Sequence, residues 1–483
     1  MSSISRKIAY NAIVSASAKV LSTILALVGI GFITRYLGKE GFGDYAVVLA
    51  FFAFFGALAD LGLYSISTRE ISRPGSDEKG ILGNVFAIRL TTSLAVVVLT
   101  PIIVAFFPYS SLVKQGIFLA ALAYIFSSGY AVLIGLFQKR LAMDKVAIGE
   151  LIGRIFQVAA IVIAVKLNLG FIAVIGTLLL NMLISFSIIY FWSRRYVKFG
   201  LRFERAAWGK FLKESYPVGI SAIIIFAYFK LDTILLSVMK ASSDVGIYNV
   251  AYKVVENISF FPAMLIGLIM PLMSRYIFHD RTKFDSVANK TFKVFLILTV
   301  PLVIGTLFLA KDIISLIGGT GFLESVAVLK LLALAMAFVF FGHFFTNIII
   351  AGNLQRKLMK VLFFCAIFNI AANLFLIPRF SYFGAAITSS LTEFLVVILS
   401  GFLAYKHLNY FPSFEKAFAI FTAGAAMAGV LYVFGNLNFF ALAVVSGSVY
   451  FLLLWISRAV STEEILSLIS KKGEEVREHE MVT

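Results

Sequence analysis

The residues of this chain that could do chemistry are the ionised side chains inside its apolar stretches. Lys19, Asp60 and Arg89 are three of these in the first part of the sequence. A charge at the centre of a membrane-spanning helix costs about 2.5–3.5 kcal/mol on insertion scales, so each one needs a partner or a task. Asp60 and Arg89 lie at similar depths in consecutive stretches, and we expect them to neutralise each other in packing. Lys19, to which the sequence assigns no acid, is expected either to bind an anion in a cavity or to extend to the membrane surface.

A second group of charges lies near the middle of the chain, in the apolar stretches at 212–239 and 245–275. Lys230 and Asp232 are two positions apart and do not face each other on a helix, whereas Lys253 and Glu256, three apart, can pair. These charges predict either an ion-pair network between the two stretches or a second binding site. The same stretches carry polar side chains that could line a cavity, although packing is the more ordinary role of such a tyrosine stripe: Tyr228, Tyr248, Asn249 and Tyr252.

Two further features concern polar groups in apolar surroundings. Asn11, Ser15 and Lys19 follow one another at helical spacing, so one face of the first stretch is predicted to be wet. Glu393 is an isolated carboxylate in the middle of a late stretch, and it is either a proton or sodium site or a neutral or paired glutamate in packing. The four histidines have no partners at metal-ligand spacing, and no glycine-rich phosphate loop is present. The sequence therefore predicts no metal site, no cofactor and no enzyme.

The elements that position these residues are predicted to be membrane-spanning helices. Hydrophobic residues make up 60% of the chain and charged residues 14%, which excludes the soluble classes. Fourteen apolar stretches are long enough to cross a bilayer: 10–36, 43–66, 81–106, 112–137, 147–166, 170–193, 212–239, 245–275, 288–309, 325–350, 357–377, 383–406, 413–434 and 438–458. The sequence thus predicts an all-α protein with 14 transmembrane helices.

The positive charges predict how these helices are oriented. The N-terminus, every second gap and the tail hold 28 of the 42 Lys and Arg residues, whereas the other gaps hold 7. Short loops rich in Lys and Arg stay on the cytoplasmic side, so both termini are predicted to be cytoplasmic. The formal net charge of +17 would suggest nucleic acid as a partner of a soluble protein. Its placement here favours the anionic inner leaflet of the cell membrane instead, so no nucleic-acid partner is expected.

Two parts of the chain look like copies of each other. At an offset of 203 residues, Gly43, Tyr45 and Val47 match Gly246, Tyr248 and Val250, and further matches at an offset of 212 link 145–183 to 357–395. With six helices in each copy, both copies begin on the inner side, so the repeat is parallel. We expect an N-terminal lobe at 1–193, a basic cytoplasmic linker at 194–211 and a C-terminal lobe at 212–408. Two added helices at 409–458 and an amphipathic cytoplasmic tail at 459–483 follow.

Several segments resemble one family. RYLGKEGFGDY at 35–45, ADLGL at 59–63 and TRE at 68–70 are similar to the opening of the polysaccharide-biosynthesis, or O-antigen flippase, family. DTILL at 232–236, VGIYNVAYK at 245–253, LIPR at 376–379 and GAA at 384–386 resemble the same family. This family belongs to the multidrug/oligosaccharidyl-lipid/polysaccharide (MOP) exporter superfamily. The resemblance implies a fold like that of the multidrug and toxin extrusion (MATE) transporters.

The resemblance implies that a polyprenyl-diphosphate-linked oligosaccharide moves from the inner to the outer leaflet by alternating access. Cations inside the cavity would hold the diphosphate headgroup: Lys19, Arg89, Lys230 and Lys253. Polar groups would contact the sugars: Asn11, Ser15, Tyr228, Tyr248, Asn249 and Tyr252. Carboxylates would serve a charge network or coupling: Asp60, Asp232, Glu256 and Glu393. The implied partners are membrane lipids and a glycan polymerase or ligase, and the coupling ion, H⁺ or Na⁺, stays open.

Three other functions compete with this interpretation. A multidrug or metabolite antiporter of the same superfamily would need an acidic pocket for cations, whereas the first six stretches bring together two cations and one acid at similar depth. Antiporters of the superfamily typically place a carboxylate in the first helix, which here has Lys19 and no Asp or Glu. A polytopic glycan polymerase or ligase would need a catalytic outer loop, and the outer gaps are short. A membrane scaffold without transport activity is the third alternative.

The charge pattern predicts the topology of the chain. A reporter fused at Gly170, in a predicted outer gap, and one fused at Lys198, in the predicted inner linker, should report opposite sides of the membrane. Alkaline phosphatase and green fluorescent protein fusions measure this directly, because the former is active outside and the latter fluoresces inside. Both reporters on one side would contradict the predicted topology.

Overall fold

The computed structural model describes residues 3–73 and 75–460, and within them every side chain except those of residues 3–9, 12, 13, 221, 227, 228 and 268. The described residues form α-helices and one 3-10 helix, and they contain no strand. The first half contains α1 (Ser3–Asp60), α2 (Leu63–Ser72), α3 (Glu78–Ala105), α4 (Ser111–Lys139), α5 (Met143–Lys166), α6 (Gly170–Ser193) and α7 (Arg205–Met239). The second half contains α8 (Ser242–Ile258), α9 (Phe260–Tyr276), α10 (Arg281–Gly318), η1 (Thr320–Phe322), α11 (Ser325–Ala351), α12 (Gln355–Leu408), α13 (Ala417–Val433) and α14 (Phe439–Ile456). The predicted tail from 461 onward lies outside the described residues.

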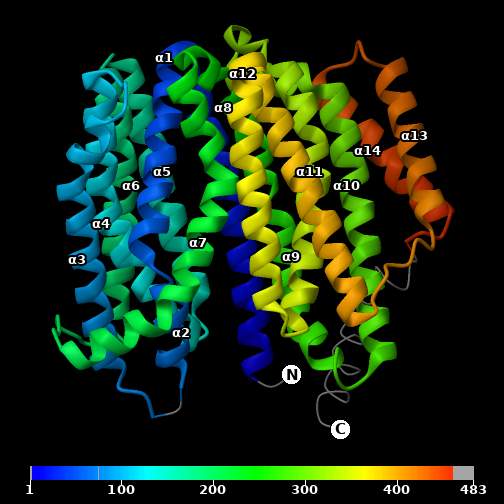
Figure 1. The fold of residues 1–483 in the computed structure, drawn as a ribbon. Helices are drawn as coiled ribbons and strands as arrows, with labels where there is room; N and C mark the ends of the chain where they lie inside the picture. The colour runs from blue at the N-terminus through cyan, green and yellow to red at the C-terminus, as the bar shows by residue number, and fades with distance from the viewer. Residues whose placement is uncertain (1–2, 74, 461–483) are drawn as a thin grey trace. The chain divides into compact units, whose positions relative to one another are not determined.

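The two longest helices are each made of two arms. α1 has 58 residues and α12 has 54, and at 1.5 Å per residue a straight helix of either length would be more than twice as long as a bilayer core of about 30 Å is thick. Each contains one residue with non-helical backbone angles, Gly38 with φ 66° in α1 and Ser381 with φ 49° in α12. Figure 1 shows α1 rising from the end marked N and turning back near its label. Each arm therefore corresponds to one apolar stretch of the sequence.

Each predicted apolar stretch lies mostly in helical residues, although α10 (Arg281–Gly318) extends well past both ends of the stretch 288–309. One stretch, 245–275, contains two helices, α8 and α9, which meet at Ser259. Among the described residues, nine helices are long and apolar enough to cross a membrane, or up to eleven if each of two bent pairs is one span, and α1 and α12 count once each. The chain is a multi-pass, all-helical membrane protein. That it crosses the membrane fourteen times stays a prediction.

The second predicted stretch, 43–66, is wrong at its C-terminal end. α1 ends at Asp60, and Leu61 and Gly62 have positive φ angles before the short helix α2 begins. Gly62 is required there, because a β-carbon at this position would lie 2.6 Å from the carbonyl oxygen of Ser215 in α7. The turn therefore packs directly against the backbone of α7, which apolarity alone does not indicate.

By the density of its contacts, the chain divides into two units. Unit 1 contains residues 1–253, 314–328 and 362–392, and unit 2 contains 254–313, 329–361 and 393–483. Helices α8, α10, α11 and α12 thus contribute to both units. The lobe and linker boundaries expected from the sequence stay predictions.

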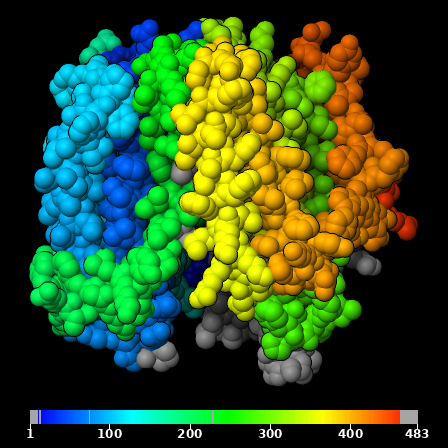
Figure 2. All heavy atoms as spheres, in the orientation of Figure 1, coloured from blue at the N-terminus to red at the C-terminus, as the bar shows by residue number. Residues whose placement is uncertain are grey.

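The basic segment before α7 and the first turns of α7 pack against the helix ends of unit 1. Val197 and Phe211 belong to an apolar cluster with Leu63, Leu82 and Val85, and Trp208 packs against it. Arg202 donates its backbone N–H to the carbonyl of Gly83 at 3.3 Å. Figure 2 shows the first turns of α7 as part of a green band across the lower ends of the blue helices. The segment is therefore held to the ends of α2, α3 and α4 by apolar contacts.

The sequence repeat reappears as a reciprocal contact between two glycines. A β-carbon at Gly43 in α1 would overlap the carbonyl oxygen of Ser242, and one at Gly246 in α8 would overlap that of Lys39. Both pairs, Gly43 with Gly246 and Lys39 with Ser242, are separated by the repeat offset of 203. Small residues at a helix crossing let two backbones approach closely. The two equivalent helices therefore cross in a nearly symmetric way.

This crossing predicts that Gly43→Ala destabilises the protein by about 1–3 kcal/mol, because overpacking at a close contact forces the helices apart. The melting temperature of purified protein in detergent measures the effect. Gly447→Ala is the matched control, since nothing lies within 4 Å of a β-carbon at this helical position. Equal melting temperatures for the two variants would show that the crossing tolerates a side chain.

Candidate functional site

Arg89 and Asp60 form the ion pair that the sequence predicts. The Arg89 guanidinium contacts the Asp60 carboxylate, and its Nη1 also donates to the carbonyl of Ser128 in α4 at 3.3 Å. Arg89 is 2% exposed, whereas the Asp60 side chain is 27% exposed. Asp60 additionally accepts from the backbone N–H of Gly62 at 3.1 Å, so it also fixes the turn after α1. Arg89 is occupied in this conformation, and its binding of a headgroup stays a prediction that requires this pair to open.

The polar face at the start of α1 lies near the turn between α4 and α5. Asn11 donates to the carbonyl of Leu141 at 2.5 Å, and Leu141 has a φ of 49°. Ser15 and Lys19 are half-buried. Lys19 interacts with another group of the protein, so it is not the isolated cation that the sequence suggests. That this face of α1 is wet stays a prediction.

A buried polar network joins α5 and α6, and none of its members is among the predicted site residues. Gln157 accepts through Oε1 from Arg154 at 2.7 Å and from Asn181 at 2.8 Å. Ser185 donates to Asn181 at 3.3 Å. Gly153 is the residue in the sequence that could have indicated this network. A β-carbon there would overlap Ser185, so the glycine lets the two helices approach each other. Close approach of the backbones is what brings the amides together.

Asp232 is held by hydroxyl groups from two other helices. Its carboxylate accepts from Tyr248 in α8 and, at 2.8 Å, from Ser389 in α12. It also accepts from the backbone N–H of Thr233 at 2.9 Å, and it is 1% exposed. The nearby amide Asn249 accepts from the Thr233 hydroxyl at 3.2 Å. This cluster, all within unit 1, ties α7, α8 and α12 together, and no pattern in the sequence indicates its member Ser389.

The tyrosine stripe of α8 is packing in this conformation. Tyr248 is fully buried against Asp232 and stacks on Tyr252, with ring centroids 5.5 Å apart. Tyr252 donates to the carbonyl of Phe229 at 2.7 Å, and Lys230 lies over its ring at 5.1 Å. Tyr248 is therefore not exposed to a sugar in this conformation, because its hydroxyl satisfies a buried carboxylate. The Tyr228 side chain lies outside the described residues.

The remaining predicted residues lie apart from these clusters. Lys253 and Glu256 are half-buried, and each has an interaction of its own. Glu393, in the unit 2 part of α12, is 8% exposed and approaches α11 at Gly342, where a β-carbon would lie 3.8 Å from its Oε2. No group of three or more His, Cys, Asp or Glu side chains suited to a metal ion lies among the described residues. A coupling role for Glu393 stays a prediction.

A further set of polar contacts joins helix ends within unit 1, at the end predicted to face outward. Arg35 donates to the carbonyls of Leu316 and Ile317 at 2.9 and 3.3 Å. Lys39 pairs with Glu324 at 2.6 Å, and this hydrogen bond lowers the pKa of the Glu324 carboxyl. Two serines complete the set, Ser242 with Asp44 at 2.7 Å and Ser381 with Asp244 at 2.5 Å. We call the contacts made by these seven side chains and two carbonyl acceptors the outer-end contacts.

The fold defines the class of protein. A solved structure of the lipid II flippase MurJ in an inward closed conformation matches with a TM-score of 0.74 and 17% sequence identity, covering 91% of this chain and 98% of that one. An inward-facing MATE family multidrug resistance transporter of the MOP superfamily matches with a TM-score of 0.63 and 14% identity, covering 82% and 98%. The chain thus has the fold of MOP superfamily transporters, as the resemblance implied.

The family follows from the sequence comparison. The family model described as polysaccharide biosynthesis protein matches residues 8–277, more than half of the chain, so the chain belongs to the polysaccharide biosynthesis protein family. The probable low-salt glycan biosynthesis flippase Agl15 of Haloferax volcanii is 23% identical over 437 residues, which cover 87% of this chain and 88% of that protein. The uncharacterized membrane protein MJ1068 of Methanocaldococcus jannaschii is 26% identical over 263 residues, but the match covers only 51% of its length.

The ion pair between Asp60 and Arg89 predicts how variants fold. Asp60→Ala should lower the amount of folded protein, because removing one partner of a buried pair costs about 3–5 kcal/mol. Asp60→Asn combined with Arg89→Gln should recover much of the folded protein, since both charges are removed and none is left unpaired. Membrane protein levels and melting temperatures measure this.

Glu204→Ala is the control for this series, because it removes an acid from the exposed pair between Arg202 and Glu204 at 3.4 Å. An exposed pair contributes at most about 1 kcal/mol, so little change is expected. A double variant no better folded than Asp60→Ala would mean that the two residues act independently.

Proposed function

We propose that this protein is a flippase that moves a polyprenyl-diphosphate-linked oligosaccharide from the inner to the outer leaflet of the cell membrane. The observation that carries the proposal is the combination of family and fold: a polysaccharide biosynthesis protein with the fold of a lipid II flippase. A relative aligned over most of both chains is itself named a probable glycan biosynthesis flippase. These findings favour a transporter over a glycan polymerase or ligase.

The headgroup would be bound near the polar face of α1. The diphosphate is anionic, and charge-assisted contacts to fixed cations are strongest where water is scarce. Lys19 is half-buried on that face together with Ser15 and Asn11, which makes it the first choice for a headgroup contact. Lys230 and Lys253 are further candidates, whereas Arg89 would first have to leave Asp60. The polyprenyl tail would remain in lipid.

Alternating access would require the outer-end contacts to break and reform. In this conformation they join residues around the kink of α1 to α8, to α10 and to Glu324 just before α11, and they join α8 to Ser381 at the kink of α12, all within unit 1. Exposed ion pairs such as Lys39 with Glu324 contribute little to stability, so this set can open at a modest cost. The membrane potential is a sufficient source of energy: a headgroup with about two negative charges gains roughly 4–5 kcal/mol on leaving a cell at 100 mV, negative inside.

The proposal predicts the behaviour of Lys19 variants. Lys19→Ala should fold normally, because alanine suits a helix, but it should lose flipping. Lys19→Arg should retain part of the activity, since the charge is kept while the geometry changes. Lys19→Glu should be the least active, because a carboxylate repels the headgroup. The measurement is the appearance of lipid-linked glycan on the outer leaflet at matched protein levels.

Lys79→Ala serves as the matched control, because Lys79 is an exposed lysine in the first turn of α3, outside the polar face of α1. It should flip at the normal rate. Wild-type flipping by Lys19→Glu would exclude Lys19 as a headgroup contact. Export of a cationic drug by the wild-type protein, without any movement of lipid-linked glycan, would favour the multidrug antiporter instead.

A further inference from the structure

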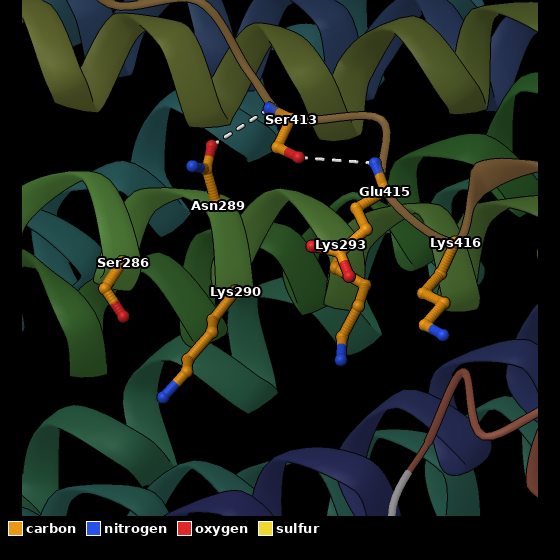
Figure 3. Close-up of a pocket in the computed structure, with 7 residues that line it drawn as sticks. All are labelled: Ser286, Asn289, Lys290, Lys293, Ser413, Glu415 and Lys416. Carbon is orange, nitrogen blue, oxygen red and sulfur yellow. Dashed lines mark hydrogen bonds between the residues drawn. The ribbon is translucent and has the colours of Figure 1, made fainter.

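Unit 2 contains a cavity that none of the predicted site residues lines. Its volume is ≈ 390 Å³, and it lies between the first turns of α10 and the segment that leads into α13. It is lined by Ser286, Asn289, Lys290, Lys293, Ser413, Glu415 and Lys416. Figure 3 shows these side chains, with Lys290, Lys293 and Lys416 extending toward the same side. Six of the seven lining residues lie at the basic gaps 275–290 and 406–416, which the charge pattern assigns to the inner side of the membrane, and Lys293 lies one helical turn beyond the first of them.

The wall of the cavity is fixed by hydrogen bonds, so the cavity is a built feature. Asn289 Oδ1 accepts from the Tyr410 hydroxyl at 2.9 Å and from the backbone N–H of Ser413 at 3.0 Å. Tyr410 is buried and packs edge-on against Phe284. Arg281 donates to the carbonyls of Leu408 and Asn409 and holds the start of the same segment. A site fixed before binding loses little conformational entropy when a ligand arrives.

The charge of the lining suits an anion. Three lysines face one acid, Glu415, whose backbone N–H is itself held by the Ser413 hydroxyl at 3.2 Å. Lys416 has a φ of 67°, a left-handed conformation that is uncommon for a residue with a side chain. This conformation begins α13 immediately after the cavity wall. Lysine ammonium groups gathered in this way bind phosphate as point charges.

The surroundings of the cavity point to a lipid as the source of the phosphate. Four aromatic side chains next to the lysines are more than half exposed: Phe411, Phe414, Phe418 and Phe421. Phe418 and Phe421 lie in the first turns of α13, and the other two lie in the segment that forms the wall. A soluble anion would make no contact with these exposed aromatic side chains. A lipid has both parts, an anionic headgroup for the lysines and chains for the aromatic rings.

We propose that this cavity binds the headgroup of an anionic phospholipid from the inner leaflet, with the acyl chains along the exposed aromatic side of α13. Basic pockets at the inner membrane surface are suited to such headgroups because the inner leaflet is anionic. Lys290 and Lys416 are exposed, so a bilayer lipid reaches them from the surface of the protein. The proposal does not rest on the flippase function, and the bound lipid is a resident of the cavity, not cargo.

The test compares lipid retention by the full chain with and without the lysines. Purified protein is incubated with phosphatidylglycerol, with phosphatidylcholine of the same acyl chains, or with a polyprenyl diphosphate, and retained lipid is counted by native mass spectrometry. Lys290→Gln combined with Lys416→Gln should weaken phosphatidylglycerol retention about tenfold or more, since each lysine near an anionic headgroup contributes several-fold. Both residues are exposed, so the variant should fold, and its melting temperature checks this.

Lys283→Gln combined with Lys360→Gln is the matched control, with the same loss of charge at exposed positions of unit 2 outside the cavity lining. It should retain phosphatidylglycerol like the wild type, and phosphatidylcholine should bind weakly to all three proteins. Equal retention of phosphatidylglycerol by the cavity variant and the control would overturn the proposal. Retention of the polyprenyl diphosphate alone would overturn it too, because the cavity would then bind the substrate of the proposed flippase. Flipping activity is measured separately, so failure of one proposal leaves the other standing.

Discussion

The structure depends on one constraint: a charge inside an apolar helix must be satisfied by protein groups, because no water is available to do so. Asp60 and Arg89 satisfy this constraint by forming an ion pair, and Asp60 also fixes the turn after α1. Asp232 meets it with two hydroxyls and a backbone N–H. Each of these two arrangements involves residues from two or three helices. The charges with the largest free-energy cost of burial therefore also determine which helices are neighbours.

The residues that carry the family resemblance are mostly the residues that hold helix ends together. The segment 35–45 supplies Arg35, Lys39, Gly43 and Asp44, and 245–253 supplies Gly246 and Tyr248. Their task is to join the ends and crossings of helices within unit 1. A family motif of this kind identifies the fold and the way it closes, and it leaves the choice of glycan to other residues.

Much of the fold follows from the sequence because an apolar stretch of sufficient length has few alternatives to a helix in a membrane. The pair formed by Asp60 and Arg89 follows as well, since the two residues lie at similar depths in consecutive stretches. The turn at Gly62 does not, because the sequence stays apolar through it. Ser389 lies 157 residues from Asp232, and the wall of the lysine-lined cavity combines segments more than 120 residues apart. Such partners are set by tertiary contacts, which local patterns do not contain.

The reciprocal contact of Gly43 with Gly246 has a consequence for the origin of the chain. Lys39 meets Gly246 as Ser242 meets Gly43, so equivalent positions of the two copies meet each other. This is the rule for an isologous interface in a two-fold symmetric dimer. A half-length ancestor carrying this helix would already have had the surface needed to pair with a second copy of itself. Fusion of two such genes would then have joined subunits that were assembled before they were linked.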